Sequence, residues 1–346
     1  MRRPFQNFPD STYGSRTREK PDSVCSSRGE IRYVGTDRPD EQATHSMPLK
    51  FALYPGCAAK GATPELYQST MAIVGRLGIE VVELAASSCC GAGVIGEADP
   101  DVALALNART FAQAERLGLD IMTICGTCQG VMSAANRRLK NEPGTLERVN
   151  TILAQDGISY GGGVQVKHLL WIAVRDIGLT RVGETVQSPF RNFRIAPFYG
   201  CYMLRPSWEL GFDDPENPSS LEKIIRAVGG EPVAYAGRTK CCGFPIILEK
   251  EAIAVAMAGT NMKDAKDHGA DFMVTPCPLC HMSLDIYQER AGQAVKTALN
   301  LPILHLPQLL GLAMGLPAQD LGLSRHLISV DRIVTRLHTP DTTHSS

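Results

Sequence analysis

Ten of the eleven cysteines form two sets with almost the same spacing. Each set has one cysteine, then 31 or 39 residues, a Cys-Cys-Gly triplet, 33 further residues and a Cys-x2-Cys pair. Thiolate sulfur is a preferred ligand of zinc and of iron–sulfur clusters. Four thiolates complete a zinc site or a cubane cluster, so a fifth must bridge two metals or belong to a larger core. The sets are Cys57, Cys89, Cys90, Cys125 and Cys128, followed by Cys201, Cys241, Cys242, Cys277 and Cys280.

Metal ligation or redox chemistry explains these cysteines better than disulfides or buried structural thiols. A chain of 346 residues does not need disulfides for stability, and no secretory signal peptide is visible. Each Cys-x2-Cys pair is expected at a strand-to-helix junction, where free N–H groups and the helix dipole stabilise thiolates. Gly91 and Gly243 allow a tight backbone path after the vicinal pairs. The eleventh cysteine, Cys25, is most simply an unused thiol.

Strands and helices alternate in the first half of the chain. Apolar runs predict strands at 51–54, 79–84 and 120–124, and helical spacing predicts helices at 64–77 and 101–117. This order is typical of βαβ units, and therefore of a parallel sheet with right-handed crossovers. Cysteines that follow the strands would meet at the carboxyl edge of that sheet.

The same order returns in the second half, which makes the chain an internal repeat. Strands are predicted at 195–200, 232–235 and 271–275, and helices at 221–228 and 249–268. We therefore expect an α/β fold of two pseudo-symmetric repeats, each a small, mostly parallel sheet flanked by helices. The sulfur-lined carboxyl ends of the strands are expected to face each other across a shared cavity.

The remaining segments set the expected domain boundaries. Residues 1–48 are polar and turn-rich and are predicted to be a disordered extension. The first domain is expected at 49–188, including a bridging segment with an amphipathic stretch at 168–177. The second domain is expected at 189–325, and residues 326–346 are expected to form a flexible tail.

Composition excludes several classes of function. Hydrophobic residues make up 44% and charged residues 21%, which is typical of a soluble globular protein. The formal net charge is -1, with Lys+Arg 35 against Asp+Glu 36, so nucleic acid and anionic membrane surfaces are poor candidate partners. No apolar run approaches the roughly 18 residues of a transmembrane helix. These features, with no export signal, predict a cytoplasmic protein without a transmembrane segment.

The two repeats resemble the cysteine-rich CCG domains of the B subunits of heterodisulfide reductases, a family that includes bacterial sulfur-metabolism types. The similarity covers about residues 48–323 and extends beyond the cysteines. The residues that carry it are Ser87-Ser88-Cys89-Cys90, Val166-Lys167-His168, Tyr199-Gly200-Cys201, Cys277-Pro278-Leu279-Cys280-His281, and the run from Pro302 through His305 and Gln308 to Gly315.

The resemblance implies cofactors and partners. In the family each set of five cysteines, one of them bridging, binds a non-cubane [4Fe–4S] cluster, and the disulfide substrate lies between the two clusters. All ten cysteines named above would be ligands, with Zn2+ in one repeat as a less favoured alternative. Electrons would come from a ferredoxin-like C subunit with cubane clusters, fed by a flavin-containing A subunit. Because this sequence has no C-x2-C-x2-C run, the relay clusters would lie on those partners, as would the flavin.

The leading hypothesis is an oxidoreductase acting on sulfur groups, as the catalytic iron–sulfur subunit of a heterodisulfide-reductase-like complex. It would perform stepwise one-electron chemistry on a disulfide, thiol or sulfur-carrier substrate in sulfur metabolism. One alternative is an electron-relay or anchoring subunit of a flavin dehydrogenase for lactate, glycolate, glycerol 3-phosphate or succinate. Another is a zinc-stabilised assembly scaffold, although the fifth thiol of each set is unexplained by that alternative.

Histidines and basic residues near the cysteines have weaker signals. His281 follows Cys280 directly and is a candidate proton donor to a thiolate product, or alternatively a residue of the helix start. His168 and His305 adjoin apolar residues and are more simply core histidines. The apolar run 306–316 is more simply a core helix than a partner-binding one. Three further basic residues are predicted to be solvated rather than functional: Lys167, Arg205 and Lys240.

Overall fold

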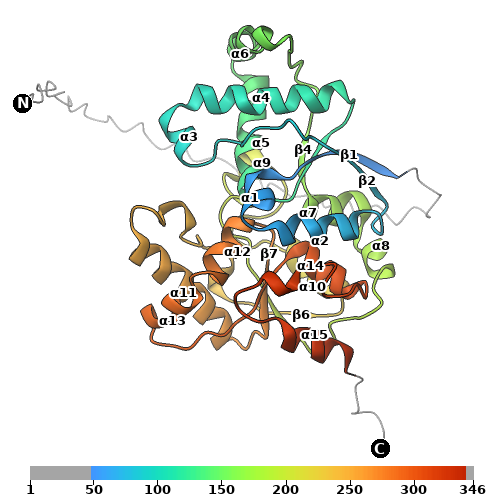
Figure 1. The fold of residues 1–346 in the computed structure, drawn as a ribbon, viewed down its shortest axis with the longest axis vertical. Coiled ribbons are helices and arrows are strands. Elements are labelled where there is room, and N and C mark those ends of the chain that lie inside the picture. The colour runs from blue at the N-terminus through green and yellow to red at the C-terminus, as the bar shows by residue number, and fades with distance from the viewer. Residues whose placement is uncertain (1–47, 340–346) are drawn as a thin grey trace, which may run out of the picture. The chain divides into compact units, whose positions relative to one another are not determined.

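Two four-stranded sheets organise residues 48–339, the part of the chain that the computed structural model describes. The strand orders are β2-β1-β3-β4 and β6-β5-β7-β8, so each strand of the second half takes the place of its counterpart in the first. Every strand pair is parallel, as predicted. The predicted extension, with Cys25, lies outside the described residues except for Pro48. Figure 1 shows the first half in blue to green and the second in yellow to red.

The first half begins with a buried strand and places helices between the strands. Residues 51–54 are buried, as expected for a parallel strand covered on both faces. The long helix after β2 has Pro100 at its first position, and the Asp99 carboxylate caps it by accepting from the Asp101 and Val102 N–H groups. The elements are β1 (Leu49–Tyr54), α1 (Gly56–Gly61), α2 (Pro64–Val74), β2 (Ile79–Glu83), α3 (Val94–Ala98), α4 (Pro100–Arg116), β3 (Ile121–Thr123), α5 (Gly126–Asn141), α6 (Thr145–Leu153), β4 (Val166–His168), α7 (Leu169–Trp171), which continues as a π-helical turn (Ile172–Ile177), and α8 (Leu179–Glu184).

The second half repeats the strand–helix order with shorter edge strands. In the central strand pair of the second half, Ile195 lies opposite Phe272. In the central pair of the first half, Ala52 lies opposite Ile121. The elements are β5 (Arg194–Pro197), α9 (Ser207–Leu210), α10 (Ser220–Ala227), β6 (Glu231–Pro232), α11 (Glu251–Asp267), β7 (Phe272–Thr275), α12 (Pro278–Asp285), α13 (Gln288–Ala294), β8 (Ile303–His305), α14 (Leu306–Ala313) and α15 (Asp331–His338), with single 3-10 turns at Ala236–Thr239, Phe244–Ile246 and Leu323–Arg325. A further 3-10 turn, Ala154–Asp156, follows α6 in the first half.

Edge strands account for the main differences from the sequence prediction. β4 and β8 were not predicted, because three-residue strands leave almost no periodic signal. The strand predicted at 232–235 spans only Glu231–Pro232. Pro232 has no N–H group to donate to a neighbouring strand, so this edge forms few ladder bonds.

The tail predicted at 326–346 requires a correction over its first part. The structure describes residues 326–339 and places α15 there, with Ile333 buried. The Arg336 guanidinium donates to the Asp271 carboxylate at 2.7 Å. An apolar side chain at helical spacing and this ion pair attach the segment to the second half, so residues 331–338 form a packed helix.

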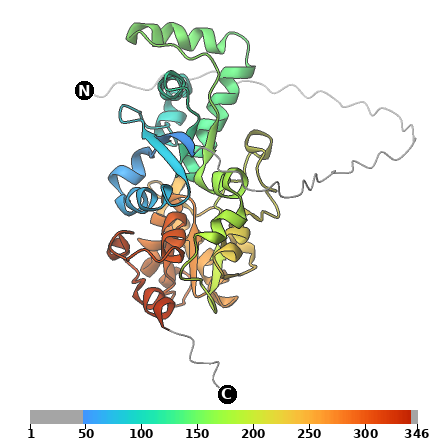
Figure 2. The same cartoon turned by 90° about the vertical axis from the view of Figure 1, so that its right-hand side faces the viewer.

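The apolar core runs through both halves. One buried cluster joins Leu53 and Leu169 to Phe190 and Leu304, and a second joins Cys90 of the first half to residues of the second. All residues of α14 are buried, so the run 306–316 begins with a core helix as predicted. Figure 2, which is turned by 90° from Figure 1, shows the two halves stacked along the vertical axis. Among residues 48–339, no helix is both long enough and apolar enough to cross a bilayer.

Candidate functional site

The first set of five thiols is assembled by the carboxyl ends of three neighbouring strands. Cys57 lies in α1, immediately after β1, and Cys89 and Cys90 follow β2. Cys125 follows β3 and is the N-cap residue of α5, whose first turn contains Cys128. The five cysteines are spread over residues 57–128, so the first and the last are 71 positions apart. The parallel sheet brings them together at one edge.

The sulfur atoms of this set lie close to one another. The Cys57 and Cys89 sulfurs are 3.8 Å apart, and the Cys90 and Cys128 sulfurs are 3.6 Å apart. The Cys128 N–H group donates to the Cys125 sulfur at 3.4 Å, which is the helix N-terminal interaction expected to favour a thiolate. Cys57 is exposed, whereas the last three members of the set are buried.

The second set has the same arrangement. Cys201 follows β5, the pair Cys241 and Cys242 follows β6, and Cys277 is the N-cap residue of α12. The Gly243 N–H group donates to the Cys241 sulfur at 3.3 Å, as the Gly91 N–H group does to Cys89 at 3.4 Å. The structure therefore brings each predicted set together; their role as metal ligands remains a prediction.

Two glycines keep the thiols close to the backbone. Gly200 has a φ of +69°, and a Cβ atom there would lie 2.7 Å from the Cys280 sulfur. Gly56, at the equivalent place in the first half, has a φ of +78°, and its Cβ would lie 3.1 Å from the Cys128 sulfur. A side chain at either position would meet sulfur as well as an unfavourable backbone conformation.

Neighbouring thiols dominate the electrostatics of both sets. Hydrogen bonds from Cys57 and then Cys90 lower the pKa of Cys89 to about 2, and the same contact raises the pKa of Cys57. In the second set the Cys201 thiol, followed by its neighbour Cys242, lowers the pKa of Cys241 to about 2. Several thiolates this close repel one another unless cations compensate them. A donor set of five adjacent sulfurs therefore fits a multinuclear metal core better than free thiols.

The two sets meet at the boundary between the halves. Cys125 is the largest influence that lowers the pKa of Cys277. The Thr127 hydroxyl lies 3.4 Å from the Cys277 sulfur, and the Gly126 N–H group donates to the Pro276 carbonyl at 3.2 Å. The ten sulfurs thus form one continuous region, joined at the first residue of each Cys-x2-Cys pair.

A cavity of about 370 Å³ opens beside the second set. Its walls come from both halves, as predicted, but the lining sulfurs belong only to the second set. Gly126 and Thr127, which lie between Cys125 and Cys128 in the chain, line the cavity from the first half. Two carboxylates, Glu97 and Glu249, also line the cavity. Its apolar and aromatic lining consists of Ala92, Val94, Tyr199, Tyr202, Met203, Phe244, Pro245, Ile247, Leu248, Leu279, Met282 and Tyr287.

The predicted histidines take structural positions. The buried His168 ring accepts at Nδ1 from the Leu170 N–H group and lies 2.9 Å from the Pro276 carbonyl through Nε2, so it connects the halves. His281 is buried, and its Nε2 contacts the Ile303 carbonyl at 3.1 Å rather than a thiol. The proposed proton-donor role of His281 stays a prediction, and these contacts do not support it.

The predicted basic residues also have other partners. Lys167 forms an ion pair with Asp176 at 3.2 Å, and Arg205 pairs with Glu216 at 2.9 Å. Lys240, which follows a 3-10 turn, is exposed. Lys167 and Arg205 therefore pair with carboxylates, and the exposure of Lys240 agrees with the prediction of a solvated side chain.

Sequence reasoning missed two buried asparagines that hold the vicinal cysteines. Asn107 on α4 donates to the Cys90 carbonyl at 2.8 Å, and Asn261 on α11 donates to the Cys241 carbonyl at 2.9 Å. A polar residue on the apolar face of the equivalent helix in both repeats was a usable signal.

The repeats match a known domain family. The model of the CCG cysteine-rich domain matches residues 51–133 and 195–285, which together make up half of the chain and contain all ten cysteines. This chain belongs to the CCG cysteine-rich domain family. Its two CCG repeats correspond to the two halves of the structure.

This chain is similar to proteins that have several kinds of name. It is 39% identical to the "8-methylmenaquinol:fumarate reductase membrane anchor subunit" of Wolinella succinogenes, over 83% of this chain and 100% of that protein. It is 32% identical to an Archaeoglobus profundus protein named as similar to the B subunit of heterodisulfide reductase, over 77% of this chain and 91% of that protein. The resemblance stated from the sequence is therefore confirmed.

A solved structure shares the fold. The crystal structure of a hypothetical protein from Helicobacter pylori superimposes with a TM-score of 0.66 at 21% identity. The match covers 82% of the CCG protein and 52% of that chain, so the CCG protein spans about half of its length. This similarity supports the fold of the paired repeats.

Proposed function

We propose that this CCG protein is the catalytic iron–sulfur subunit of a heterodisulfide-reductase-like complex. The observation that supports this proposal best is the cavity of about 370 Å³, lined by Cys201, Cys242, Cys277 and Cys280 and bordered by both halves. A redox centre beside a cavity has room for a substrate, whereas a pure electron relay needs only short distances between centres. The similarity to the Archaeoglobus profundus protein supports the same function.

Each set of five cysteines would hold one [4Fe–4S] cluster of the non-cubane type. When bound, such clusters supply one electron at a time and sites where sulfur can bind iron. Reduction of a disulfide consumes two electrons and two protons and yields two thiols. The proposed two clusters, adjacent through Cys125 and Cys277, would together provide the two electrons.

The chain's own residues would shape the cavity around the sulfur groups. Thr127 reaches the Cys277 sulfur, and the lining is largely apolar apart from the carboxylates of Glu97 and Glu249. A ferredoxin-like C subunit and a flavin-containing A subunit are the proposed electron donors. The proposed reaction needs such donors because the chain offers no further cysteine set for relay clusters.

Anaerobic purification and a single-turnover assay test this function. We expect a brown protein with about eight irons per chain and an electron paramagnetic resonance signal from each cluster. The reduced protein, mixed with a small organic disulfide, should release two thiols for every two electrons consumed. Iron-free protein is the control. A colourless zinc protein, or a reduced iron protein that releases no thiol from any disulfide or sulfur-carrier donor tested, would contradict the proposal.

A second candidate function is an electron-transfer or anchoring subunit of a flavin dehydrogenase. The 39% identity with the fumarate reductase anchor subunit, over its entire length, favours this candidate. The same clusters would then pass electrons between a quinol and a flavin subunit. Co-purification with a fumarate- or succinate-active flavoprotein, together with reduction of the clusters by a menaquinol analogue and no thiol release, would select this function over the first.

A further inference from the structure

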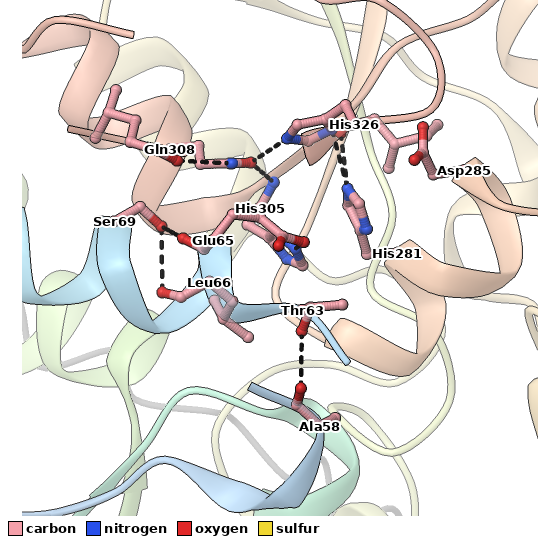
Figure 3. Close-up of polar contacts among 12 residues, drawn as sticks. Ala58, Thr63, Glu65, Leu66, Ser69, His281, Asp285, His305, Gln308 and His326 are labelled. Atoms are coloured by element: carbon pink, nitrogen blue, oxygen red, sulfur yellow. Dashed lines mark hydrogen bonds and ion pairs between the residues drawn. The ribbon is translucent and has the colours of Figure 1, made fainter. Parts of the chain in front are cut away.

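Three histidines and two carboxylates form a buried cluster that the sulfur chemistry does not use. Glu65 comes from α2 of the first half, whereas His281 and Asp285 come from α12 of the second. His305 ends β8, and His326 follows the 3-10 turn Leu323–Arg325. Figure 3 shows these side chains turned toward one another from four different segments.

The distances within the cluster suit a metal ion. Ligand atoms of Glu65, His281 and His305 all lie within 4.8 Å of one another, and so do those of His281, Asp285 and His326. Nε2 of His281 is 3.2 Å from Nδ1 of His326, and Nε2 of His305 is 3.4 Å from Oε1 of Glu65. Ligands about 2.0–2.1 Å from a tetrahedral Zn2+ ion lie roughly 3.3–3.4 Å from each other. Each of these two contacts has the length of one tetrahedron edge, and the two groups of three ligands share His281.

One nitrogen of the cluster has an unused lone pair or proton. His305 is 0% exposed, and its Nδ1 atom has no hydrogen-bond partner. In the first half the equivalent nitrogen of His168 accepts from the Leu170 N–H group. Leu170 is two residues after His168. The residue two positions after His305 is Pro307, which has no N–H group. A cation bound at Nε2 of His305 would not satisfy this nitrogen, which lies on the side of the ring that caps α14.

The charges of the cluster also suit a cation. Burial lowers the pKa of the His326 ring to about 4. This imidazole is therefore neutral at pH 7, which is the form that binds metals. Burial raises the pKa of the Glu65 carboxyl, and a bound divalent cation would compensate its negative charge.

We propose that Glu65, His281, His305 and His326 form a binding site for Zn2+ or a similar divalent transition metal, separate from the ten cysteines. Three imidazoles and one carboxylate form a donor set that Zn2+ accepts. Asp285 would act as a positioning residue, because its carboxylate accepts from the Leu327 and Ile328 N–H groups and holds the loop that begins after His326.

The site would connect the two CCG repeats. It joins α2 of the first repeat to α12 and β8 of the second, and His281 adjoins the cluster-ligand candidate Cys280 on α12. Metal binding would replace the contact of His281 Nε2 with the Ile303 carbonyl. The ion would thus stabilise the paired arrangement of the halves without entering the sulfur region.

Zinc titration of the full chain, purified anaerobically with its iron, tests this proposal. We expect one Zn2+ per chain in a site whose X-ray absorption spectrum shows nitrogen and oxygen ligands with imidazole scattering and no sulfur. Glu65→Gln and His326→Gln should each weaken Zn2+ binding by at least about tenfold, since even indirect partners of metal ligands contribute that much. Iron content should stay unchanged in both variants.

His268→Gln is the matched control, because His268 is an exposed histidine at the end of α11. This variant should bind Zn2+ like the wild type. Sulfur scattering around the zinc, no retained zinc in the wild type, or equal affinity in the wild type and the folded variants would overturn the proposal. Two conservative substitutions on different elements are used so that failure of one to fold still leaves a test.

Discussion

At the scale of single residues, the thiols depend on glycines as much as on the cysteines themselves. Gly200 and Gly56 lie directly before Cys201 and Cys57, and each brings the backbone against the last sulfur of its own set. Each of these positions combines a positive φ with contact to sulfur. This combination separates them from glycines that only end a helix or a turn.

We expect Gly200→Ala to remove the second cluster selectively. The new Cβ atom would lie 2.7 Å from the Cys280 sulfur and displace that ligand. Iron content should fall from about eight to about four per chain. Gly211→Ala is the control, because Gly211 has a φ of +58° with no atom within 4 Å of its Cβ. If both variants keep their iron, the contact is not important for ligation.

The first thiol of each vicinal pair is the candidate bridging ligand. Cys89 and Cys241 each receive a glycine N–H group and interact with two other thiols. We expect Cys89→Ala or Cys241→Ala to change the electron paramagnetic resonance spectrum of only the cluster in the same half. Cys25→Ala, outside both sets, should leave the spectrum unchanged. A silent Cys89→Ala variant would favour a four-thiolate site with a spare thiol.

At the scale of elements, the long helices α4 and α11 support the loops that carry the vicinal cysteines. Each helix packs beside its sheet and sends one asparagine amide to a cysteine carbonyl. The helices therefore position the cysteines through the backbone rather than through sulfur. The first loop has no strand or helix between β2 and α3, and the second has only the 3-10 turns Ala236–Thr239 and Phe244–Ile246.

We expect Asn107→Ala to destabilise both the fold and the first cluster. The variant leaves the Cys90 carbonyl without this donor, at a cost of roughly 1–3 kcal/mol in the free energy of unfolding. Asp99→Ala removes the cap of the same helix and should cost about 1 kcal/mol. Thermal unfolding should detect both losses, but only Asn107→Ala should lower the iron content. Equal iron content in the two variants would argue against a role for the amide.

At the scale of the whole molecule, the two repeats share one core and one sulfur region. Gly126 and His168 of the first repeat both bond to the Pro276 carbonyl of the second. Thr127 then places a hydroxyl of one repeat next to a thiol of the other. The properties of one proposed cluster should therefore depend on residues of the other repeat.

We expect Thr127→Val to lower the reduction potential of the second cluster by tens of millivolts. Hydrogen bonds to ligand sulfur stabilise the reduced, more negative state, and valine has a similar shape without the hydroxyl. A redox titration followed by electron paramagnetic resonance measures the shift. Thr110→Val, on α4 and bonded to the Leu106 carbonyl, is the control. An unchanged potential in Thr127→Val would show that the hydroxyl does not act on the second site.

The alternation of strand and helix patterns predicted the α/β class, and the repeated spacing of the cysteines predicted the paired repeats and the two sets of thiols. Buried strands such as 51–54, followed at once by a cysteine, leave few alternatives, because parallel strands must present their carboxyl ends at one edge. The elements that sequence reasoning missed are short ones. β4 and β8 have three residues each, and only their neighbours β3 and β7 make them strands.

Tertiary structure alone decided how the two repeats meet. Local patterns specify the elements within a repeat, but contacts between residues far apart in the chain depend on how the two cores pack. The sequence did not indicate that Thr127 would reach Cys277, or that the cavity would expose sulfur of the second set only. Nor did it show that Glu65 and His305, 240 residues apart, would meet in one buried cluster. Such pairs have no periodic signal, because burial and packing of both repeats bring them together.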